Sequence, residues 1–427
     1  MRLHRTLLIV SALVALLAPF ALPAGGVAIA QGARPGLDRS YGKHGTTTVT
    51  TWFDEERFSA FKVTPGGRSY ILDDNQIFAF QSNGKVAGSF GEGGRMILAP
   101  DFALGEVGAR DLTLDSRGRI LVTGSALAPP GWKTDKAWVI RLLPNGSRDP
   151  EFGDDGEVDT TFGLPSVNGS GPSVNAAAIA VDAEDRPVVG GSFGERPGYC
   201  DFGRGPDPFV ARLTATGALD TTFAGSGHAV LKGPGEFRSL APVPSGGLAV
   251  FSSACPAEPR LEATGSVLSA FGEGGEASAT VQGVLLPFSY KAPVLDPEGR
   301  IVQLESVPPA AEGVDAVARS LPDGERDPSF GLGGRVPLRN KPHYGTAIAV
   351  DAQSRPIIAL YAGKIILRRY LPEGAVDMGF GPEGRLTAGG VAPSAIALDA
   401  SGRIYTVSLK RDLHHTKVTL ARFIPGP

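Results

Sequence analysis

The sequence predicts an all-β fold, a seven-bladed β-propeller of four-stranded antiparallel blades closed by pairing the N-terminal strand with the three C-terminal strands. Three observations predict it. An aromatic-glycine motif recurs seven times, each unit contains apolar stretches of period two around a polar turn, and the two ends of the chain carry complementary parts of one unit. Four short strands per repeat are typical of propellers, which pack their blades around a channel.

Residues 1–30 have the pattern of a secretory signal peptide. Two arginines precede an apolar run, and an Ala-Ile-Ala tripeptide stands just before Gln31. Pro19 and Pro23 interrupt the run, so a retained membrane anchor is the weaker interpretation. We expect cleavage, a secreted or cell-surface location, no transmembrane segment in the mature chain, and a single propeller domain of seven repeats over residues 31–427.

The aromatic-glycine motif sets the repeat. In most copies an aspartate lies three residues before the aromatic residue, one glycine follows it, and a second glycine comes three residues later. Aspartate and serine begin turns, glycine supplies positive φ, and an aromatic ring is large enough to anchor a turn between sheets, so we interpret the motif as structural. The aromatic residues are Tyr41, Phe90, Phe152, Phe223, Phe271, Phe330 and Phe380.

A second signature is a hairpin with a polar turn, as in the stretch 112–122. Alternating apolar residues on both sides of an Asp/Gly turn predict two paired strands. The recurring turn aspartates could form a ring of carboxylates that binds cations, but most of these turns also carry an arginine, so paired, solvated turns are favoured. The aspartates are Asp115, Asp182, Asp296, Asp351 and Asp399, and the arginines are Arg68, Arg119, Arg186, Arg300, Arg355 and Arg403.

The ends of the chain distinguish a closed ring from an open solenoid, which also stacks repeats. The chain after residue 30 opens with the motif and the fourth strand of a unit, Thr46 to Thr51, and closes with the first three strands of another, Ile396 to Ile424. Each part alone would leave an unpaired strand edge, and pairing the two parts removes both edges. This division predicts closure of the ring.

These motifs resemble the delta-60 repeat of bacterial β-propeller proteins. The resemblance rests on Leu-Asp-x-Ser/Thr-Phe-Gly-x-x-Gly, the apolar-Asp-x-x-Gly-Arg-apolar hairpin and the Arg-Leu-x-Pro-x-Gly turn, and covers roughly residues 36–427. Departures are the missing aspartate in the second and fifth copies, Ala224 in place of glycine in the fourth, and Gly379 in the last. The resemblance implies fold and secretion, and it implies no agreed activity and no catalytic residues.

Composition and motifs exclude several function classes. A net charge of −3 with both signs interspersed gives no electrostatic basis for nucleic-acid binding, and two cysteines cannot build a thiolate zinc site or an iron-sulfur cluster. Gly190 to Gly194 matches a nucleophile elbow, but no helix is expected after it. Asp73-Asp74-Asn75 begins like a calcium loop, yet Ile77 replaces an oxygen ligand, so a solvated loop is favoured. We assign no catalytic residue, metal or cofactor.

The two cysteines, Cys200 and Cys255, fall in equivalent connections of neighbouring units. Equivalent connections lie on one face, so a disulfide between blades is geometrically possible in an oxidising compartment. We predict this bridge, which thiol labelling of the denatured, unreduced protein tests. Two free buried cysteines are the alternative.

Loop lengths point to the functional face. The connections from second to third strand and from fourth strand to the next unit vary in length, and both emerge on one face of a propeller. The ligand-binding candidates on that face are Trp52, Trp132, Lys133, Tyr199, Asp201, Arg204, His343, Tyr344, His414 and His415. Aromatic and polar side chains suit an unknown carbohydrate, peptide or protein ligand, although ordinary exposed loops would have a similar composition.

Two function classes follow. The favoured one is a monomeric, secreted, non-enzymatic binding or scaffolding module, because no acid-base pair, activated nucleophile or ligand cluster can be placed from the sequence. The alternative is a secreted propeller enzyme, a hydrolase, lyase or lactonase, whose site is assembled at the channel mouth from residues of several blades.

Overall fold

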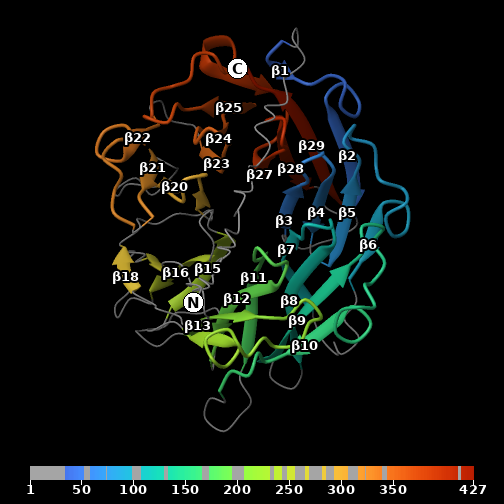
Figure 1. Ribbon diagram of the computed structural model, residues 1–427. Coiled ribbons are helices and arrows are strands. Elements are labelled where there is room, and N and C mark those ends of the chain that lie inside the picture. The colour runs from blue at the N-terminus through green and yellow to red at the C-terminus, as the bar shows by residue number, and fades with distance from the viewer. Residues whose placement is uncertain are drawn as a thin grey trace, which may run out of the picture.

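The computed structural model describes seven antiparallel sheets that surround a common axis, as Figure 1 shows. The predicted seven-bladed propeller is therefore confirmed. The described residues are 34–51, 58–73, 75–98, 107–128, 133–165, 173–194, 206–230, 235–242, 248–254, 265–268, 281–284, 293–305, 316–322, 324–338, 344–411 and 415–427.

The blades are numbered in chain order, and each has its first strand innermost. Blade 1 contains β3 (Phe58–Val63), β4 (Ser69–Asp73), β5 (Gln76–Phe80) and β6 (Arg95–Ile97). Blade 2 contains β7 (Val107–Leu114), β8 (Ile120–Ala128), β9 (Lys133–Leu142) and β10 (Glu157–Thr160). Blade 3 contains β11 (Val174–Val181), β12 (Pro187–Phe193), β13 (Asp207–Arg212) and β14 (His228–Val230).

The remaining blades follow the same plan. Blade 4 contains β15 (Gly235–Pro242), β16 (Leu248–Ala254), β17 (Gly265–Leu268) and β18 (Val281–Val284). Blade 5 contains β19 (Val294–Leu295), β20 (Ile301–Glu305), β21 (Ala316–Ser320) and β22 (Arg335–Pro337). Blade 6 contains β23 (Tyr344–Val350), β24 (Pro356–Tyr361), β25 (Ile365–Arg369), a 3-10 turn (Pro382–Gly384) and β26 (Arg385–Ala388).

Blade 7 closes the ring with strands from both ends of the chain. Its first three strands are β27 (Pro393–Leu398), β28 (Ile404–Arg411) and β29 (Thr416–Ile424). β2 (Thr46–Thr51) pairs with β29 along its whole length, and β1 (Gly36–Leu37) extends the same edge. The predicted closure and the predicted bounds of the N-terminal strand are both confirmed, and Figure 1 shows β2 beside β29.

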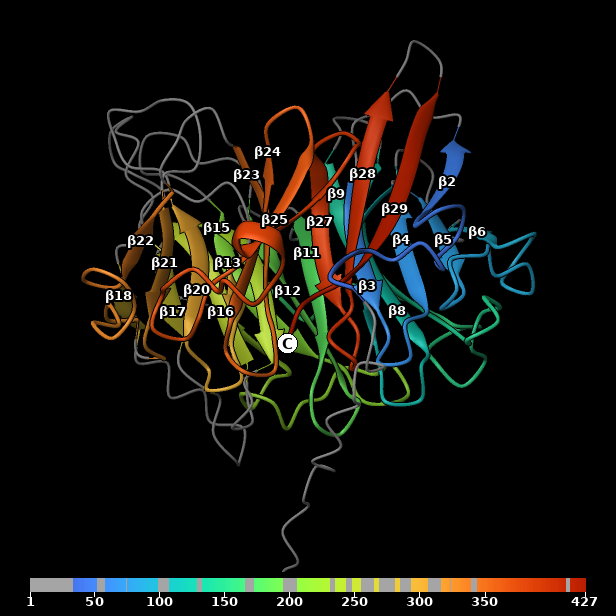
Figure 2. The ribbon, with the colours of Figure 1, turned by 90° about the horizontal axis from the view of Figure 1, so that it is seen from above.

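The strand bounds define two different faces. Every connection from first to second strand has five residues, from 64–68 in blade 1 to 399–403 in blade 7. These turns lie on the same face as the aromatic-glycine motifs, which we call the motif face. The connections from second to third strand range from two residues (74–75) to thirteen (194–206) and lie on the opposite, variable face. In Figure 2, β28 and β29 extend far on the variable face.

The core consists of apolar layers between neighbouring blades. Successive residues of a strand point to opposite sides of its sheet, so each strand supplies two layers. In blade 2, Ile120 and Val122 pack toward blade 1, whereas Leu121 packs toward Ile179 of blade 3. Burial on both sides explains why a second strand such as β24 is apolar at nearly every position, whereas a first strand such as β7 alternates near its end.

Blade 4 departs from the repeat. The fifth copy of the motif predicts a turn at Leu268, but Leu268 ends strand β17, and Phe271 lies outside the described residues. The missing motif aspartate does not by itself account for this difference, because the second copy also lacks it and still forms the turn at Phe90.

Candidate functional site

In blades 2, 5, 6 and 7 the motif builds a link to the next blade. In blade 2, the guanidinium of Arg141 lies 4.5 Å from the ring centroid of Phe152, and its Nε donates to Asp149 at 2.8 Å. Its Nη1 donates to the carbonyl of Ala215 in blade 3 at 2.5 Å. The structural interpretation of the motif is therefore confirmed, and we call this set an inter-blade link.

The motif glycine contributes to the same connection. Gly153 has φ of 56° and donates its N–H to the carbonyl of Thr216 in blade 3 at 2.9 Å. A Cβ at this position would lie 2.0 Å from the carbonyl oxygen of Glu157, so the site requires glycine. The other inter-blade links are Arg319–Asp327–Phe330, Arg369–Asp377–Phe380 and Arg422–Asp38–Tyr41, whose arginines donate to carbonyls of the next blade. Arg212, Asp220 and Phe223 make the corresponding contacts within blade 3.

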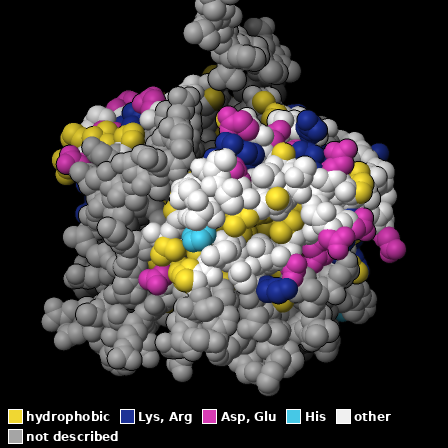
Figure 3. Space-filling view, turned by 60° about the horizontal axis from the view of Figure 1, so that its bottom comes forward, with side chains coloured by type: hydrophobic (Ala, Val, Ile, Leu, Met, Phe, Trp, Pro, Cys, Tyr) yellow, Lys and Arg dark blue, Asp and Glu magenta, His cyan; other side chains and the backbone are white. Residues whose placement is uncertain are grey.

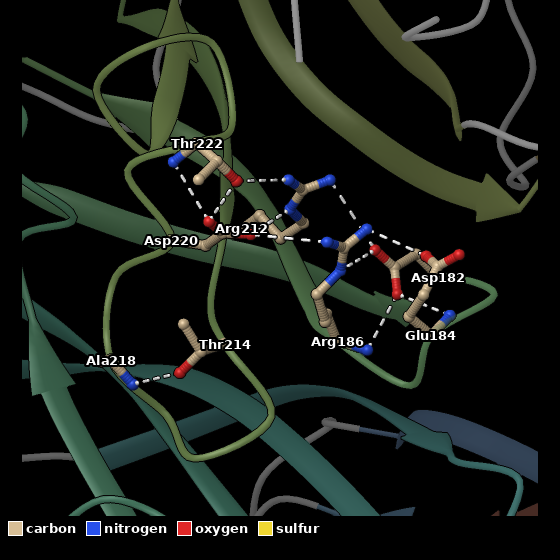
Figure 4. A network of polar contacts seen from close by, with 8 residues as sticks. All are labelled: Asp182, Glu184, Arg186, Arg212, Thr214, Ala218, Asp220 and Thr222. Atoms are coloured by element: carbon tan, nitrogen blue, oxygen red, sulfur yellow. Dashed lines mark hydrogen bonds and ion pairs between the residues drawn. The ribbon is translucent and has the colours of Figure 1, made fainter. Parts of the chain in front are cut away.

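The turn aspartates are paired, as predicted. Figure 4 shows Arg186 beside Asp182 and Arg212 beside Asp220. The Nε of Arg186 lies 2.7 Å from Asp182, and the Nε of Arg212 lies 2.8 Å from Asp220. Contacts of 3.8 Å join the two pairs into one network. The predicted solvation holds only in part, because turn residues such as Ser116 and Arg117 are exposed whereas the side chain of Asp399 is fully buried. In the described part of the chain, no three His, Cys, Asp or Glu side chains could hold a metal ion.

The inter-blade links hold their carboxylates in the ionised form. Burial opposes ionisation of Asp149, but hydrogen bonds and the charge of Arg141 outweigh it and lower the pKa of this carboxyl. The pKa values of Asp220 and Asp327 are lowered in the same way, by neighbouring hydrogen bonds and by their own arginines. The recurring charges of the motif face therefore serve the ring itself.

The structure describes only part of the predicted ligand face. Lys133 begins β9 and Tyr344 begins β23, both at strand ends on the variable face, and half-buried His415 directly precedes β29. All three lie on the predicted face. Outside the described residues lie Trp52, Trp132, Tyr199, Asp201, Arg204, His343 and His414, as well as Cys200 and Cys255, so their predicted roles and the disulfide stay predictions.

Two buried polar residues near the variable face were not expected. Asp73 ends β4 and is 3% exposed, and Gln76 begins β5 and is 1% exposed. The solvated loop predicted here is wrong, because the two strands continue to within two residues of each other and bury both side chains. An alignment of the repeats would have indicated that Gln76 is buried. The positions equivalent to Gln76 hold the large apolar residues Trp138 in blade 2 and Phe209 in blade 3.

Glu305 is a second unexpected buried group. It ends β20, is fully buried, and accepts a hydrogen bond of 2.8 Å from the side-chain amide of Gln303. It also pairs with Arg326 and, at 2.9 Å, with Arg335. The equivalent position in blade 2 is Gly124, which lies under the ring of Trp138.

Asp111 lies on β7, the innermost strand of blade 2, and is an acid with a raised pKa. Its carboxylate accepts hydrogen bonds from the backbone N–H groups of Leu112 (2.8 Å) and Ile179 of blade 3 (3.1 Å). Burial within the ring raises the pKa of this carboxyl, and the charge of Lys62 only partly opposes the shift. Equivalent positions hold Ala60 and Ala178, so the ring does not need an acid here.

Asp111→Asn is expected to stabilise the protein at pH 7. A folded-state pKa above 3.8 means that ionisation is less favourable in the folded than in the unfolded chain, so wild-type stability is lost as the pH rises through this pKa. The matched variant Asp149→Asn should have the opposite effect, because the lowered pKa of Asp149 stabilises the fold above pH 3.8. Urea unfolding at pH 7 and pH 3 measures both. Equal midpoints for Asp111→Asn and wild type at pH 7 would contradict the assignment.

The face of the molecule drawn in Figure 3 shows mixed charge, with acidic and basic side chains interspersed. A surface pocket of about 290 Å³ lies between Gly36 and the outer strand β26, and its lining includes Lys364, Glu383 and Arg385. It lies on the outer rim, away from the channel. None of the described segments is a helix with the length and apolarity needed to cross a bilayer.

Comparisons with known proteins agree with this architecture. Residues 188–223, from β12 to the motif phenylalanine of blade 3, match the family described as "Domain of unknown function (DUF5122) beta-propeller". No curated protein matches the chain.

Solved structures resemble the chain in fold. The "Crystal Structure of Mitotic Checkpoint Complex" contains a chain with 9% identity and a TM-score of 0.50, covering 92% of this chain and 94% of that one. The "Structure of Dos1 propeller" has 10% identity and a TM-score of 0.49, covering 85% and 78%. A protein of unknown function from Bacteroides caccae has 11% identity and a TM-score of 0.39, covering 74% and 90%. At such identities the likeness concerns the fold alone.

Proposed function

We propose that the protein is a secreted, non-enzymatic propeller of the delta-60 repeat type that binds a carbohydrate, peptide or protein ligand through the loops of its variable face. The signal-like residues 1–30 support secretion. The repeat motifs and the propeller-family match over residues 188–223 support the repeat type.

One observation carries the binding role, namely the contrast between the two faces. The first connection of every blade has five residues, and the recurring charges beside it are engaged in ion pairs within the ring. The variable-face connections differ in length from two to thirteen residues. Binding loops are usually carried by a rigid scaffold whose other connections stay constant, and this ring has that arrangement.

Shortening a variable-face connection is expected to abolish ligand binding and leave the fold intact. The connection 194–206 can be replaced by a two-residue turn, the length used in blade 1. Binding is measured on glycan and peptide arrays, and folding by thermal unfolding. The control is Arg117→Ala, which changes an exposed turn residue of the motif face. The proposal fails if the shortened-loop variant keeps the array signal, or if Arg117→Ala loses it as well.

Asp111 favours a second candidate, a hydrolase, lyase or lactonase. A carboxyl whose pKa is raised on the inner strands of a ring has the property required of a general acid or base. The test is a screen with ester, lactone and glycoside substrates. Turnover that survives Asp111→Asn would exclude this residue as the acid or base.

A further inference from the structure

A surface groove of about 290 Å³ lies at the outer edge of blade 6, and we call it the blade 6 groove. Three of the four residues of β26, Arg385 to Thr387, line it on one side, and Gly36 of β1 lines it on the other. β26 pairs with β25 and with no other described strand, because β1 pairs with β29 of blade 7. The edge of β26 beside the groove is therefore free.

The backbone groups of Thr387 point toward this free edge. The N–H of Arg385 donates to the carbonyl of Pro382 in the turn before β26, so it points away from β25. Backbone groups two residues apart in a strand point the same way, so the N–H and C=O of Thr387 also point outward. No described group bonds to them. The groove thus offers an unpaired donor and an unpaired acceptor of the kind that a further strand would use.

The blade 6 groove also has an excess of positive charge. Its lining includes the cations Lys364 and Arg385 and a single acid, Glu383. Glu383 pairs with Arg385, whereas no described group pairs with the exposed ammonium of Lys364. Directly opposite Arg385 on β25 lies a further cation, Arg368, whose Nε is buried without a hydrogen-bond partner. Like charges in opposite positions destabilise a sheet, so this edge favours an anionic ligand.

The ring itself does not need the facing arginines. The position of Arg368 is the one opposite the first residue of the outer strand, and in four other blades a buried apolar residue occupies it. These residues are Ile140, Ala211, Ala318 and Ala421 in blades 2, 3, 5 and 7. The positive charge of this edge is therefore a property of blade 6 and not of the repeat.

We propose that the blade 6 groove binds an extended acidic peptide, which adds as a strand to the free edge of β26. The peptide backbone pairs with the N–H and C=O of Thr387, and an acidic side chain pairs with Lys364 at the variable-face end of the groove. Thr387 and Lys364 are exposed, so a peptide reaches both from solvent. β26 has four residues, so a tetrapeptide spans it. This site lies on the outer rim and does not depend on the binding role proposed above.

The charge is tested with two tetrapeptides, acetyl-Val-Glu-Val-Thr-amide and its neutral match acetyl-Val-Gln-Val-Thr-amide, titrated by calorimetry. Wild type should bind the acidic peptide with a Kd at least about threefold lower than the neutral one, as expected for one exposed ion pair. Lys364→Gln should remove this difference. The control is Lys85→Gln, which changes an exposed lysine in a motif-face turn of blade 1 and should bind both peptides as wild type does.

The strand addition is tested with Thr387→Pro. Proline removes the outward N–H and is tolerated on edge strands, so this variant should unfold at the wild-type temperature and bind the acidic peptide at least about tenfold more weakly. Thr387→Ala keeps the N–H and should bind as wild type does. If Thr387→Pro fails to fold, Lys364→Gln still decides, because the acidic peptide must lose its advantage there.

The inference is overturned if wild type binds neither peptide, if it binds both equally, or if folded Thr387→Pro binds the acidic peptide unchanged. A wild-type dimer that Thr387→Pro dissociates, measured by analytical ultracentrifugation, would assign the edge to a second copy of the chain and also overturn it. None of these outcomes bears on an array ligand that is lost on shortening 194–206, so the two binding proposals fail separately.

Discussion

Replacing Arg422 with alanine is expected to lower the free energy of unfolding by about 3–5 kcal/mol, because it leaves a buried carboxylate without its counter-charge. Arg422 lies on C-terminal strand β29, and its Nε donates to Asp38 at 2.8 Å. Its guanidinium lies 4.6 Å from the ring centroid of Tyr41 and donates to the carbonyl of Ser82 in blade 1. One side chain thus joins both ends of the chain to the first blade.

Arg319→Ala is the matched control for closure. Arg319 makes the same inter-blade link, with Asp327 at 2.7 Å, Phe330 at 4.7 Å and the carbonyl of Pro372 at 2.6 Å. Blades 5 and 6 are joined by the chain itself, so this variant loses similar contacts without releasing an end. Only Arg422→Ala should expose the N-terminal strands to trypsin.

The measurement is urea unfolding together with the rate of tryptic cleavage at the exposed residue Lys43, beside the start of β2. Equal cleavage rates in the two variants would show that the closing link does not hold the N-terminal strands. A double-mutant cycle with Asp38→Ala isolates the pair, because contacting residues deviate from additivity by about 0.5–3 kcal/mol. The coupling should decline at low pH, since the lowered pKa of Asp38 means that its stabilisation is lost as the carboxyl is protonated.

The sequence predicted the ring because its evidence is local. Period-two apolarity and the turn motif are confined to short windows, and they located Thr46 to Thr51 as the closing strand with the bounds that the structure gives. The burial of the turn aspartates could not be predicted from such short windows of sequence. Arg212, on the third strand of the same blade, lies beside Asp182 and shields it from water. Which residue shields this turn therefore depends on the register between strands, which the sequence near the turn does not reveal.

The buried polar residues show the same limit. Nothing within a few residues of Gln76 or Glu305 marks them as buried. Their burial follows from which side of the sheet they occupy and from what the neighbouring blade presents. Only a comparison between repeats, such as Glu305 against Gly124, exposes them in the sequence. The loop candidates, by contrast, were chosen by connection length, and most of them stay predictions.

Glu305→Gln is expected to lower the free energy of unfolding by about 3 kcal/mol, near the lower end for breaking a buried ion pair. The carboxylate is fully buried and is the shared partner of Arg326 and Arg335. The side chains of these arginines are 30% and 41% exposed, so water can replace part of the lost interaction.

Blade 2 indicates how the loss can be repaired. There the residues equivalent to Arg326 and Arg335 are Arg148 and Glu157, which pair at 2.6 Å, and the residue equivalent to Glu305 is a glycine. Adding Arg335→Glu to Glu305→Gln transfers this arrangement into blade 5 and should restore at least half of the lost stability. Arg335→Glu alone should destabilise the protein, since it places a second carboxylate beside Glu305. Urea unfolding of the three variants measures these effects, and additive losses in the double variant would refute the equivalence of the two networks.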